Sequence, residues 1–411
     1  MHEDAAVLRA HRISVVCSGF SDPRRDVSKP DVVVIGAGVV GASVAWHLAC
    51  RGVKVTLLDR GHGTGDGSSA RATGGFRAQY GTAINIRLSL LSRAKLRAFR
   101  EEVGVDPGYE TAGYLWLATT TRELTILRDG CALQHLEGVI EAEVVTTDDI
   151  RRLNPAVFDP KVIGGTYCPT DGFLRPGAIL DGYLHGARAM GAEVRWDTRV
   201  TGAERSGETI SAVLTDRGPV PCGAVVVACG PWSGEVGRIL GVAIAVQPLR
   251  RQVAPTVPTQ ALPAGMPMTI WAGDGFHLRV RDGRVLLLRP TEGDPRDPWS
   301  TAVEDSWVRE VTGMAHARVP ALRDVPTDRL GCWAGLYEMS PDKHALLGRA
   351  HGAANAFTAT GNSGHGVMHS PAEGLLLSEL MIDGAFRSLD ATSLRPTRFA
   401  EGAAIQGPAL L

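Results

Sequence analysis

The sequence predicts an α/β protein with a Rossmann-like nucleotide-binding domain, assembled from separate segments, and a second α+β domain with an antiparallel sheet. Three observations support this fold class. A strand, a glycine turn, a helix and a second strand follow one another over residues 32–58. Another buried apolar strand comes much later, at Ala224–Ala228, and residues 247–330 show the alternation and turn residues of antiparallel strands.

The first βαβ unit is the strongest local signal. β-branched residues at Val32–Ile35 predict a strand, and apolar residues at helical spacing follow the glycine turn. Gly52 is expected to end this helix in a left-handed conformation, and Val53–Leu58 forms a second buried strand that closes with Asp59. This order of elements is that of a dinucleotide-binding fold.

The residue types in the turn each fit that fold. Gly36 allows the tight turn, Gly38 lets the backbone approach a pyrophosphate, and Gly41 permits close packing of helix and strand. The N-terminus of the helix then faces the negative charge of the ligand. Asp59 fits a ribose hydroxyl and disfavours a 2′-phosphate, which leaves FAD or NAD as the cofactor.

A long loop follows the second strand. Residues 61–82 are too rich in Gly and Ser for regular structure, and loops of this length in compact domains usually serve a function. We therefore expect this loop to contact cofactor or substrate. A helix is predicted from Ile84 to Glu102, then a strand over 113–119 and a helix near 121–136.

The rest of the chain alternates between the two predicted sheets. A helix over Pro176–Met190, a hairpin and the third buried strand return to the first sheet. From Gln247 to about Leu330 the pattern predicts antiparallel strands covered by a helix at Val303–Arg318. The stretch TGNSGHGVMHSPAEG, residues 360–374, then forms a loop ahead of a helix that ends at Gly384.

Composition and charge argue against several function classes. The formal net charge is -1 and no run of Lys and Arg exceeds a pair, so no nucleic acid partner is expected. No uninterrupted apolar segment reaches the roughly 20 residues that span a bilayer, so no membrane partner is expected. The seven cysteines are scattered without CxxC spacing, which predicts a cytoplasmic protein. Residues 1–29 lack a signal-peptide pattern and are expected to form a mobile N-terminal arm.

Four blocks follow one another along the chain: VVVIGAGVVGASVAWHLACRGVKVTLLDRG, GSSARATGGFRAQYG, VVVACGPWS and TGNSGHGVMHSPAEG. Together they resemble the FAD-dependent amino acid and amine oxidoreductases of the D-amino acid oxidase superfamily, over nearly the whole chain beyond residue 30. The chain is most similar to the branch that contains sarcosine oxidases and the dimethylglycine and proline dehydrogenases. The resemblance implies FAD as the cofactor and a small-molecule amine or amino acid as the substrate.

The resemblance also implies that the FAD-binding domain is interrupted twice by segments of a substrate domain. The FAD-binding segments are residues 30–110, 166–245 and 332–400. The substrate domain comprises residues 111–165 and 246–331. Residues 401–411 form a C-terminal tail.

In this family the loop that matches Gly361 to Met368 passes the flavin ring, and the helix after it points its N-terminus at the ring. Glycines let the backbone contact a planar ring, and the helix dipole stabilises negative charge there. The resemblance assigns the following residues to the cofactor: Gly36, Gly38, Val39, Val40, Gly41, Asp59, Arg60, Ser68, Ser69, Arg71, Gly75, Val200, Ala228, Gly230, Trp232, Gly361, Gly364, His365, Gly366, Val367 and Met368.

The candidate catalytic residues are Arg77, His365 and Met368. Arg77 lies in FRAQYG, which resembles the segment of monomeric sarcosine oxidases whose arginine holds the substrate carboxylate. The alternative is a loop arginine that binds backbone carbonyls. Arg71 and the pair Arg250-Arg251 are weaker candidates that fit structural roles equally well.

No metal site is expected. His365 and His369 have the i, i+4 spacing of a metal pair, but no HExxH pattern accompanies them and the preceding glycines break the helical phase. His365 is expected near the flavin, and His369 at the surface or at the start of a helix.

Three departures from the monomeric sarcosine oxidases bear on mechanism. Met368 stands where they carry a second carboxylate anchor, a lysine. Gly335 stands where they bind the flavin through a cysteine, and Cys332 lies three residues upstream, so the FAD is predicted to be non-covalent. Their oxygen-activating lysine has no clear counterpart here, which leaves oxygen or another electron acceptor.

The leading hypothesis is oxidation of a C–N bond in an amino acid, an N-alkyl amino acid or an amine, by hydride transfer to flavin N5 that gives an imine, which hydrolyses. One alternative is a dehydrogenase that passes electrons to a non-oxygen acceptor or to a partner subunit. Another is a non-catalytic flavin-binding subunit. An NAD-dependent dehydrogenase is supported by the first motif alone.

Overall fold

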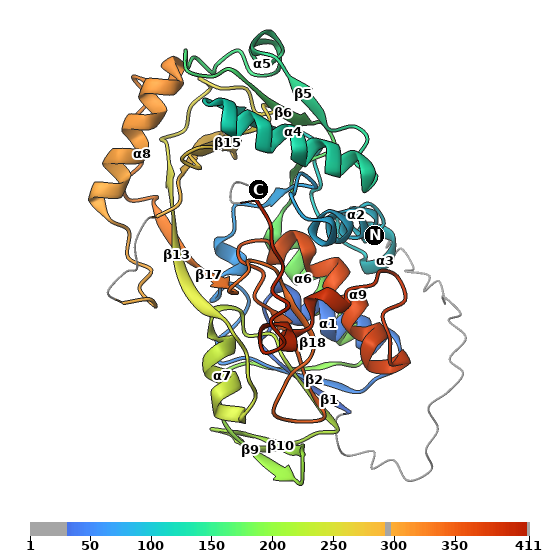
Figure 1. Ribbon diagram of the computed structural model, residues 1–411. Coiled ribbons are helices and arrows are strands. Elements are labelled where there is room, and N and C mark those ends of the chain that lie inside the picture. The colour runs from blue at the N-terminus through green and yellow to red at the C-terminus, as the bar shows by residue number, and fades with distance from the viewer. Residues whose placement is uncertain (1–30, 292–296, 409–411) are drawn as a thin grey trace, which may run out of the picture.

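The structure is a computed structural model that describes residues 31–291 and 297–408, so the expected arm at residues 1–29 lies outside the described residues. Two regions stack on each other. Figure 1 shows one around a six-stranded sheet in the lower half of the view and the other around an eight-stranded sheet in the upper half.

The six-stranded sheet contains, in spatial order, β18 (Leu346–Arg349), β19 (Ala356–Thr360), β12 (Ala224–Val227), β1 (Val32–Ile35), β2 (Val55–Leu58) and β8 (Glu193–Arg195). All neighbours are parallel except β18, which runs antiparallel to β19. Valines dominate β1 and β12 because central parallel strands are buried on both faces, where β-branched side chains pack well.

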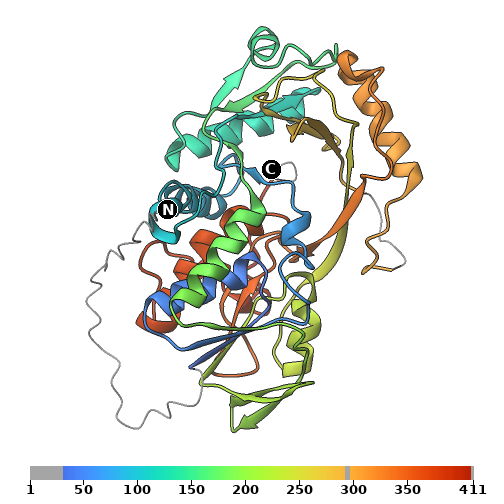
Figure 2. The ribbon, with the colours of Figure 1, turned by 180° about the vertical axis from the view of Figure 1, so that it is seen from behind.

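Helices cover one face of this sheet: α1 (Val39–Cys50), α2 (Ala83–Arg97), α3 (Phe99–Val103), α6 (Pro176–Ala189) and α9 (Gly366–Asp383). Figures 1 and 2 show α1 between α6 and α9. Gly374 allows α9 to approach α1, since a Cβ there would lie 2.2 Å from the Ser43 Oγ. This close packing fixes the direction in which the start of α9 points.

The opposite face is covered by α7 (Ser233–Leu240) and a three-stranded antiparallel sheet of β9 (Val200–Ser206), β10 (Thr209–Thr215) and β11 (Gly218–Pro221). Ile210, Val213 and Val220 from this small sheet form one hydrophobic cluster with Val225 and Val227 of β12. The six-stranded sheet is therefore sandwiched between two layers.

The eight-stranded sheet contains, in spatial order, β17 (Trp333–Met339), β13 (Gln247–Pro255), β16 (Arg284–Leu288), β15 (His277–Arg281), β14 (Met268–Trp271), β4 (Tyr114–Ala118), β6 (Gly164–Cys168) and β5 (Glu143–Val145). Helix α8 (Asp305–Arg318) packs on it through Trp307, Val308 and Val311, near α5 (Thr147–Leu153). Helix α4 (Thr121–Leu136) packs through Leu127 against a second cluster that contains Trp116.

Short elements connect the two regions. β3 (Gly75–Phe76) pairs with β7 (Gly172–Phe173) and carries the chain from the first domain toward the second sheet. The single-turn 3-10 helices are Ser69–Arg71, Gly230–Trp232, Pro320–Leu322, Thr392–Leu394 and Pro396–Phe399.

The large sheet has the predicted antiparallel pairing with one exception. β14 runs parallel to β4. Its strands also cross the expected segment boundaries: β17 belongs to it although residues 332–400 were assigned to FAD binding, and β6 spans the boundary at residue 166. Local sequence patterns carry no information on the partner of a strand, so neither feature was accessible from them.

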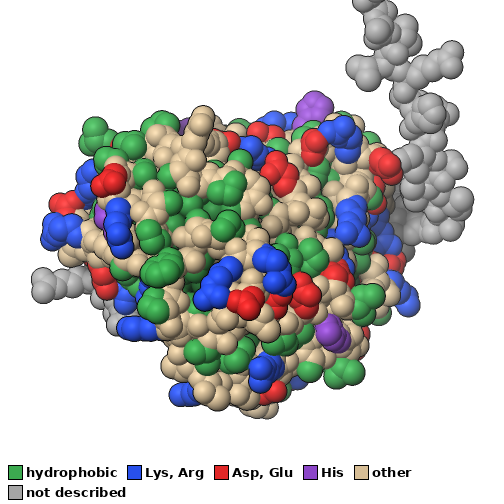
Figure 3. Space-filling model, turned by 90° about the horizontal axis from the view of Figure 1, so that it is seen from above, with side chains coloured by type: hydrophobic (Ala, Val, Ile, Leu, Met, Phe, Trp, Pro, Cys, Tyr) green, Lys and Arg blue, Asp and Glu red, His purple; other side chains and the backbone are tan. Residues whose placement is uncertain are grey.

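Most predicted elements occur with small shifts. The second strand begins at Val55 rather than Val53, the helix predicted over 84–102 is split at Ala98, and α4 matches its expected bounds. Gly52 has a φ of 79°, as a left-handed cap requires. In the described part of the chain, no helix is long and apolar enough to cross a membrane. Basic and acidic side chains are interspersed on the face in Figure 3.

Candidate active site

A cavity of about 1190 Å³ extends from the glycine turn after β1 to the inner face of the eight-stranded sheet. This volume exceeds the upper range of about 1,000 Å³ for ordinary small-molecule pockets, so a dinucleotide and a small second ligand can share it. We call its two parts the nucleotide end, lined by the β1–α1 turn and neighbouring loops, and the substrate end, lined by β4, β13 and β15.

Backbone groups form the nucleotide end. Gly38 caps α1 without a side-chain hydrogen bond, and no acidic residue lies in the first turn, so the positive helix end is open to an anion. The carboxylate of Asp59 accepts hydrogen bonds of 2.7 Å from the N–H groups of Ala37 and Gly61. These contacts hold the acid at the end of β2, where the sequence places a ribose-binding residue.

Two glycines in the turn have no room for a side chain. Gly36 has a φ of 104°, and a Cβ there would lie 2.3 Å from the carbonyl oxygen of Ala228. A Cβ at Gly41 would lie 1.9 Å from the oxygen of Gly36, so Gly41 faces the turn rather than the cavity. Its role in helix–strand packing is the one that the spacing predicts.

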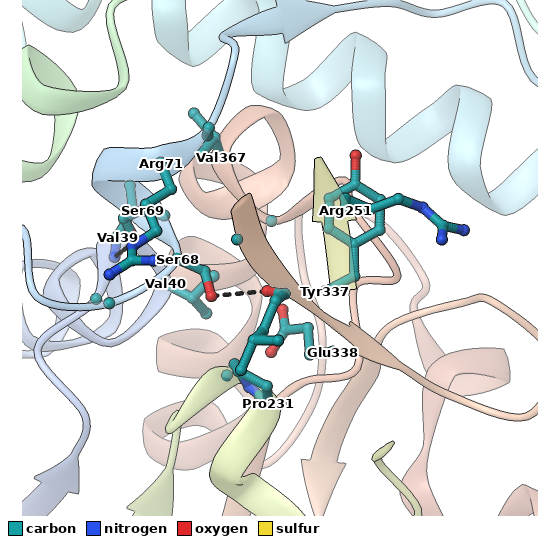
Figure 4. A pocket seen from close by; sticks show the side chains of 18 of the residues that line it. Val39, Val40, Ser68, Ser69, Arg71, Pro231, Arg251, Tyr337, Glu338 and Val367 are labelled. Atoms are coloured by element: carbon teal, nitrogen blue, oxygen red, sulfur yellow. Dashed lines mark hydrogen bonds between the residues drawn. The ribbon is translucent and has the colours of Figure 1, made fainter. Parts of the chain in front are cut away.

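The long loop after β2 contributes two serines and an arginine. The Ser69 Oγ accepts a 3.0 Å bond from the N–H of Val39, and the Ser68 Oγ donates a 2.7 Å bond to the oxygen of Leu336 on β17. Arg71 donates a 2.8 Å bond to the oxygen of Ala334. The loop thus ties the first turn of α1 to the edge strand of the large sheet (Figure 4).

The start of α9 forms the wall between the two ends. Gly364 has a φ of 102°, and a Cβ there would lie 2.3 Å from the Tyr337 ring, so only glycine lets the loop pass. Gly366 begins the helix with His365 as its N-cap. Gly361 departs from its expected role, since it does not line the cavity and packs toward Leu346.

Aromatic rings and one carbonyl hold Arg77 at the substrate end. Its guanidinium lies 4.2 Å from the ring centre of Tyr80 and 5.1 Å from that of Trp116, and it donates a 3.1 Å bond to the oxygen of Gln79. No described carboxylate lies within ion-pair distance of it. Arg77 therefore has the carbonyl contact of a structural arginine and a charge that is still available to a ligand.

Burial keeps the histidines here neutral. It lowers the pKa of His365 well below its usual value, and the nearby Arg77 charge lowers it further. His369 lies near the start of α9, one of its two expected positions, and is 2% exposed rather than at the surface. It shares a 2.9 Å hydrogen bond with Ser89. Met368 is 4% exposed and lines the cavity, where its sulfur accepts a bond from the Tyr80 hydroxyl.

Sequence reasoning missed several lining residues on the strands of the large sheet. They include Trp116 on β4, His277 on β15, and Tyr337 and Glu338 on β17. Arg251 on β13, only a weak candidate from sequence, also lines the cavity, with its guanidinium 5.4 Å from the Tyr337 ring centre. Figure 4 shows Arg251 beside Tyr337, and Glu338 beside Pro231. Arg250 points away and pairs with Glu304.

A pair of carboxyl groups lies behind the wall. The side-chain amide of Asn362 donates to Glu338 at 3.0 Å and to Glu373 at 3.2 Å. Glu373 is 0% exposed, and burial together with the charge of Glu338 raises its pKa to about 8. Burial raises the pKa of Glu338 as well. Glu373 therefore retains its proton at neutral pH.

The cavity brings together most of the residues that the sequence assigned to the cofactor: Gly36, Gly38, Val39, Val40, Asp59, Arg60, Ser68, Ser69, Arg71, Gly75, Val200, Ala228, Gly230, Trp232, Gly364, His365, Gly366, Val367 and Met368. Arg60 stacks over Trp232 at 4.4 Å. Within the described ranges, no group of three or more His, Cys, Asp or Glu side chains is arranged to hold a metal ion.

These residues fit a bound FAD. The open first turn of α1 suits a pyrophosphate, and the volume is sufficient. The glycines at 36 and 364 let the backbone line the cavity where a Cβ would clash with Ala228 or Tyr337. Gly335 lines the cavity, whereas Cys332 is not among the lining residues and its thiol contacts the oxygen of Asp328 at 3.4 Å.

Comparisons with known proteins agree with this geometry. Residues 31–380 match the model of the DAO family, described as FAD dependent oxidoreductase. A 4-methylaminobutanoate oxidase (formaldehyde-forming) of Paenarthrobacter nicotinovorans is 26% identical over 90% of this chain and 45% of its own length. The chain thus spans less than half of that relative. A glycine oxidase of Geobacillus kaustophilus is 26% identical over 85% of this chain and 92% of its own.

A solved structure is also similar. The L-proline dehydrogenase from P. horikoshii superposes with a TM-score of 0.84 at 28% identity, and the match covers 91% of this chain and 98% of that one. Its mixed fold of parallel and antiparallel sheets is the one described above.

Proposed function

Because the chain belongs to the DAO family of FAD-dependent oxidoreductases, we propose that it oxidises the C–N bond of an amino acid, an N-alkyl amino acid or a related amine. The observation that carries the proposal is the position of Arg77. It is a guanidinium without a described carboxylate partner, in the cavity that also contains the glycine cradle for the cofactor.

The bound FAD supplies an acceptor for the hydride that leaves the carbon next to the substrate nitrogen. The chain supplies orientation. Arg77 binds the substrate carboxylate through two parallel N–H···O bonds, and the rings of Tyr80 and Trp116 hold the guanidinium in place. Loss of the hydride and of the amine proton leaves an imine, which water hydrolyses to a carbonyl compound and an amine.

The substrate end favours the neutral amine that this reaction needs. Arg77 and Arg251 both line it, and positive charges nearby lower the pKa of a bound ammonium. His365 is neutral because burial, and after it the Arg77 charge, lowers its pKa. The proposal therefore assigns no side chain as general base. The pH dependence of kcat/KM tests this assignment. A value that rises with pH and becomes constant well below the pKa of the free substrate amine would support it.

We test the function by anaerobic reduction of the purified holoprotein. Glycine, sarcosine, L-proline, the alanine enantiomers and simple secondary amines are added one at a time while the visible flavin spectrum is recorded. Bleaching by one of them supports the proposal. A yellow protein that no amine bleaches contradicts it and favours a non-catalytic flavin-binding subunit, whereas a protein that binds NAD but no flavin contradicts the cofactor.

Admission of air then distinguishes the acceptors. Rapid recovery of the flavin absorbance indicates an oxidase. Persistent bleaching indicates a dehydrogenase with another acceptor or a partner subunit.

We also propose a cytoplasmic location on the basis of the cysteines. The six that lie in described residues are all free thiols. Alkylation of the denatured, unreduced protein should label every cysteine, and a disulfide would contradict this location.

A further inference from the structure

The substrate end contains two arginines that the chain leaves without an acidic partner. Arg77 contacts two rings, one backbone oxygen and, at 3.5 Å, the Nε2 of His365. Arg251 contacts the Tyr337 ring and, at 3.3 Å, the oxygen of Arg250. Among the described residues, no carboxylate lies within ion-pair distance of either guanidinium. Both arginines are half-buried. Charged groups that are partly withdrawn from water are normally paired, so two arginines without an ion pair in a single cavity call for an anionic ligand.

The acidic side chains near the substrate end are already hydrogen-bonded to other residues. Asp274 lines the cavity, but Arg318 donates hydrogen bonds to both of its oxygens. Glu338 accepts bonds from Thr360 and Asn362, and burial raises its pKa toward the neutral form. A third acid, Asp171, is buried and interacts electrostatically with Arg77, but its oxygens accept hydrogen bonds from Ala78 and Gln79 instead. None of these three acids forms an ion pair with Arg77 or Arg251.

The pKa of His277 is affected by both arginines. It lies on β15 within the cavity wall, and burial, together with smaller contributions from Arg77 and Arg251, lowers its pKa to about 4. The ring is therefore influenced by both guanidinium groups and adds no positive charge at neutral pH. Both arginines thus act on one shared space.

The register of the sheet explains how Arg251 reaches this space. Arg251 pairs with Gly335 across β13 and β17, and Tyr337 lies two residues further along the same face of β17. Tyr337 in turn packs against Gly364, next to His365. Arg251 therefore lies beside the loop that begins α9. That loop leads to Met368, which stands where monomeric sarcosine oxidases carry a lysine as their second carboxylate anchor.

We propose that the substrate carries a second carboxylate, which Arg251 binds while Arg77 binds the first. This inference rests on the proposed function and names its substrate class: an N-substituted or free amino acid with two carboxylate groups. With a neutral amine, such a substrate brings two negative charges to two positive ones. An amine without a carboxylate leaves both guanidinium groups uncompensated.

The first test uses ligand binding to the oxidised holoenzyme. Glutarate and pentanoate differ by one carboxylate at equal chain length, and each is titrated while the visible spectrum of the bound flavin is recorded. We expect glutarate to bind at least about tenfold more tightly. The series from malonate to pimelate then reports the separation of the two anchors.

Variants assign the preference to Arg251. R251M should bring the two dissociation constants to within about a factor of two, R251K should keep part of the preference, and R281M should leave it unchanged. Arg281 is a suitable control because it lies on β15 outside the cavity and stacks on Trp333. Retained flavin absorbance shows that each variant is folded. Equal affinities in the unmodified protein, or an unchanged ratio in R251M, would overturn the proposal.

A second test separates this inference from the proposed function. N-Methylglutamate and N-methylnorvaline differ mainly by the distal carboxylate, and each is mixed anaerobically with the holoenzyme. Faster bleaching by N-methylglutamate supports both proposals, and equally fast bleaching by the two amines refutes only the second carboxylate. If neither amine bleaches the flavin although glutarate is still preferred, the C–N oxidation fails while the anionic site stands.

Discussion

The two ends of the cavity are built from different parts of the chain. At the nucleotide end, the glycine turn and the start of α1 form the floor, with Asp59 fixed by Ala37 and Gly61, and neighbouring loops complete it. At the substrate end, side chains from β4, β13, β15 and the β3 loop converge from distant positions. The first design fixes the cofactor by backbone shape, and the second sets specificity through side chains that can change independently.

Glycine substitution at the nucleotide end should have the largest effect. Gly36→Ala places a methyl group 2.3 Å from the oxygen of Ala228, so the turn must open. We expect the affinity for FAD to fall by at least about 100-fold, which corresponds to about 2.7 kcal/mol. Flavin content after dialysis and fluorescence titration of the apoprotein measure the change.

Gly52→Ala is the matched control. Gly52 also has a positive φ, but a Cβ there meets nothing within 4 Å. It should lower stability modestly and leave flavin content unchanged. Full retention of FAD by Gly36→Ala would show that backbone shape does not decide binding at this end.

Replacing one arginine at each end of the cavity should have different effects on catalysis and on flavin binding. Arg77→Met removes a charge-assisted contact worth about 1.5–3 kcal/mol, so kcat/KM for a carboxylated substrate should fall by about 10- to 150-fold with flavin content preserved. Arg71→Met removes the bond to Ala334 and should instead loosen the flavin. Steady-state kinetics and flavin content are measured for both variants. If Arg77→Met releases the flavin, the two ends are not independent.

The carboxyl pair at the boundary between the two ends should appear in the pH dependence of stability. Burial holds Glu373 protonated to about pH 8, whereas in the unfolded chain it ionises near its ordinary value of 4.5. Unfolding thus releases a proton between these values, and stability falls as pH rises, by up to about 1.4 kcal/mol per pH unit.

Glu373→Gln cannot ionise and should lose that slope. The difference between its melting temperature and that of the unmodified holoprotein should increase from about pH 4.5 to pH 8, in favour of the variant, and should stay constant above pH 8. Glu204→Gln, an exposed acid on β9, is the control and should run parallel to the unmodified protein. A parallel curve for Glu373→Gln would mean that Glu373 is ionised in the folded state.

The smallest effect is expected at Cys332. Gly335 faces the cavity and Cys332 does not, so the flavin should have no covalent bond to the chain. Acid precipitation should release the yellow colour into the supernatant, and Cys332→Ser should change neither flavin content nor spectrum. Colour that stays with the precipitate and is lost in Cys332→Ser would contradict the prediction.

The paired arginines show where sequence reasoning stops. Adjacent residues of a strand point to opposite faces, so Arg250 and Arg251 had to differ in environment. The sequence does not tell which one faces the cavity, because that depends on the register of β13 against β17. The structure places Arg250 against Glu304 and Arg251 in the cavity. The same limit explains why β4 and β14 were not expected to run parallel.

The sequence alone determined the α/β class, the glycine turn with Asp59, a dinucleotide as the cofactor and the position of Arg77 in the loop after β3. These depend on residues close together in the chain, where steric limits on φ and hydrophobic periodicity act locally. Only the tertiary structure decided that Arg251, His277 and Tyr337 share a wall, that His369 is buried, and that Glu338 and Glu373 meet through Asn362. Long-range strand pairing and helix packing create these contacts, and no local pattern encodes them.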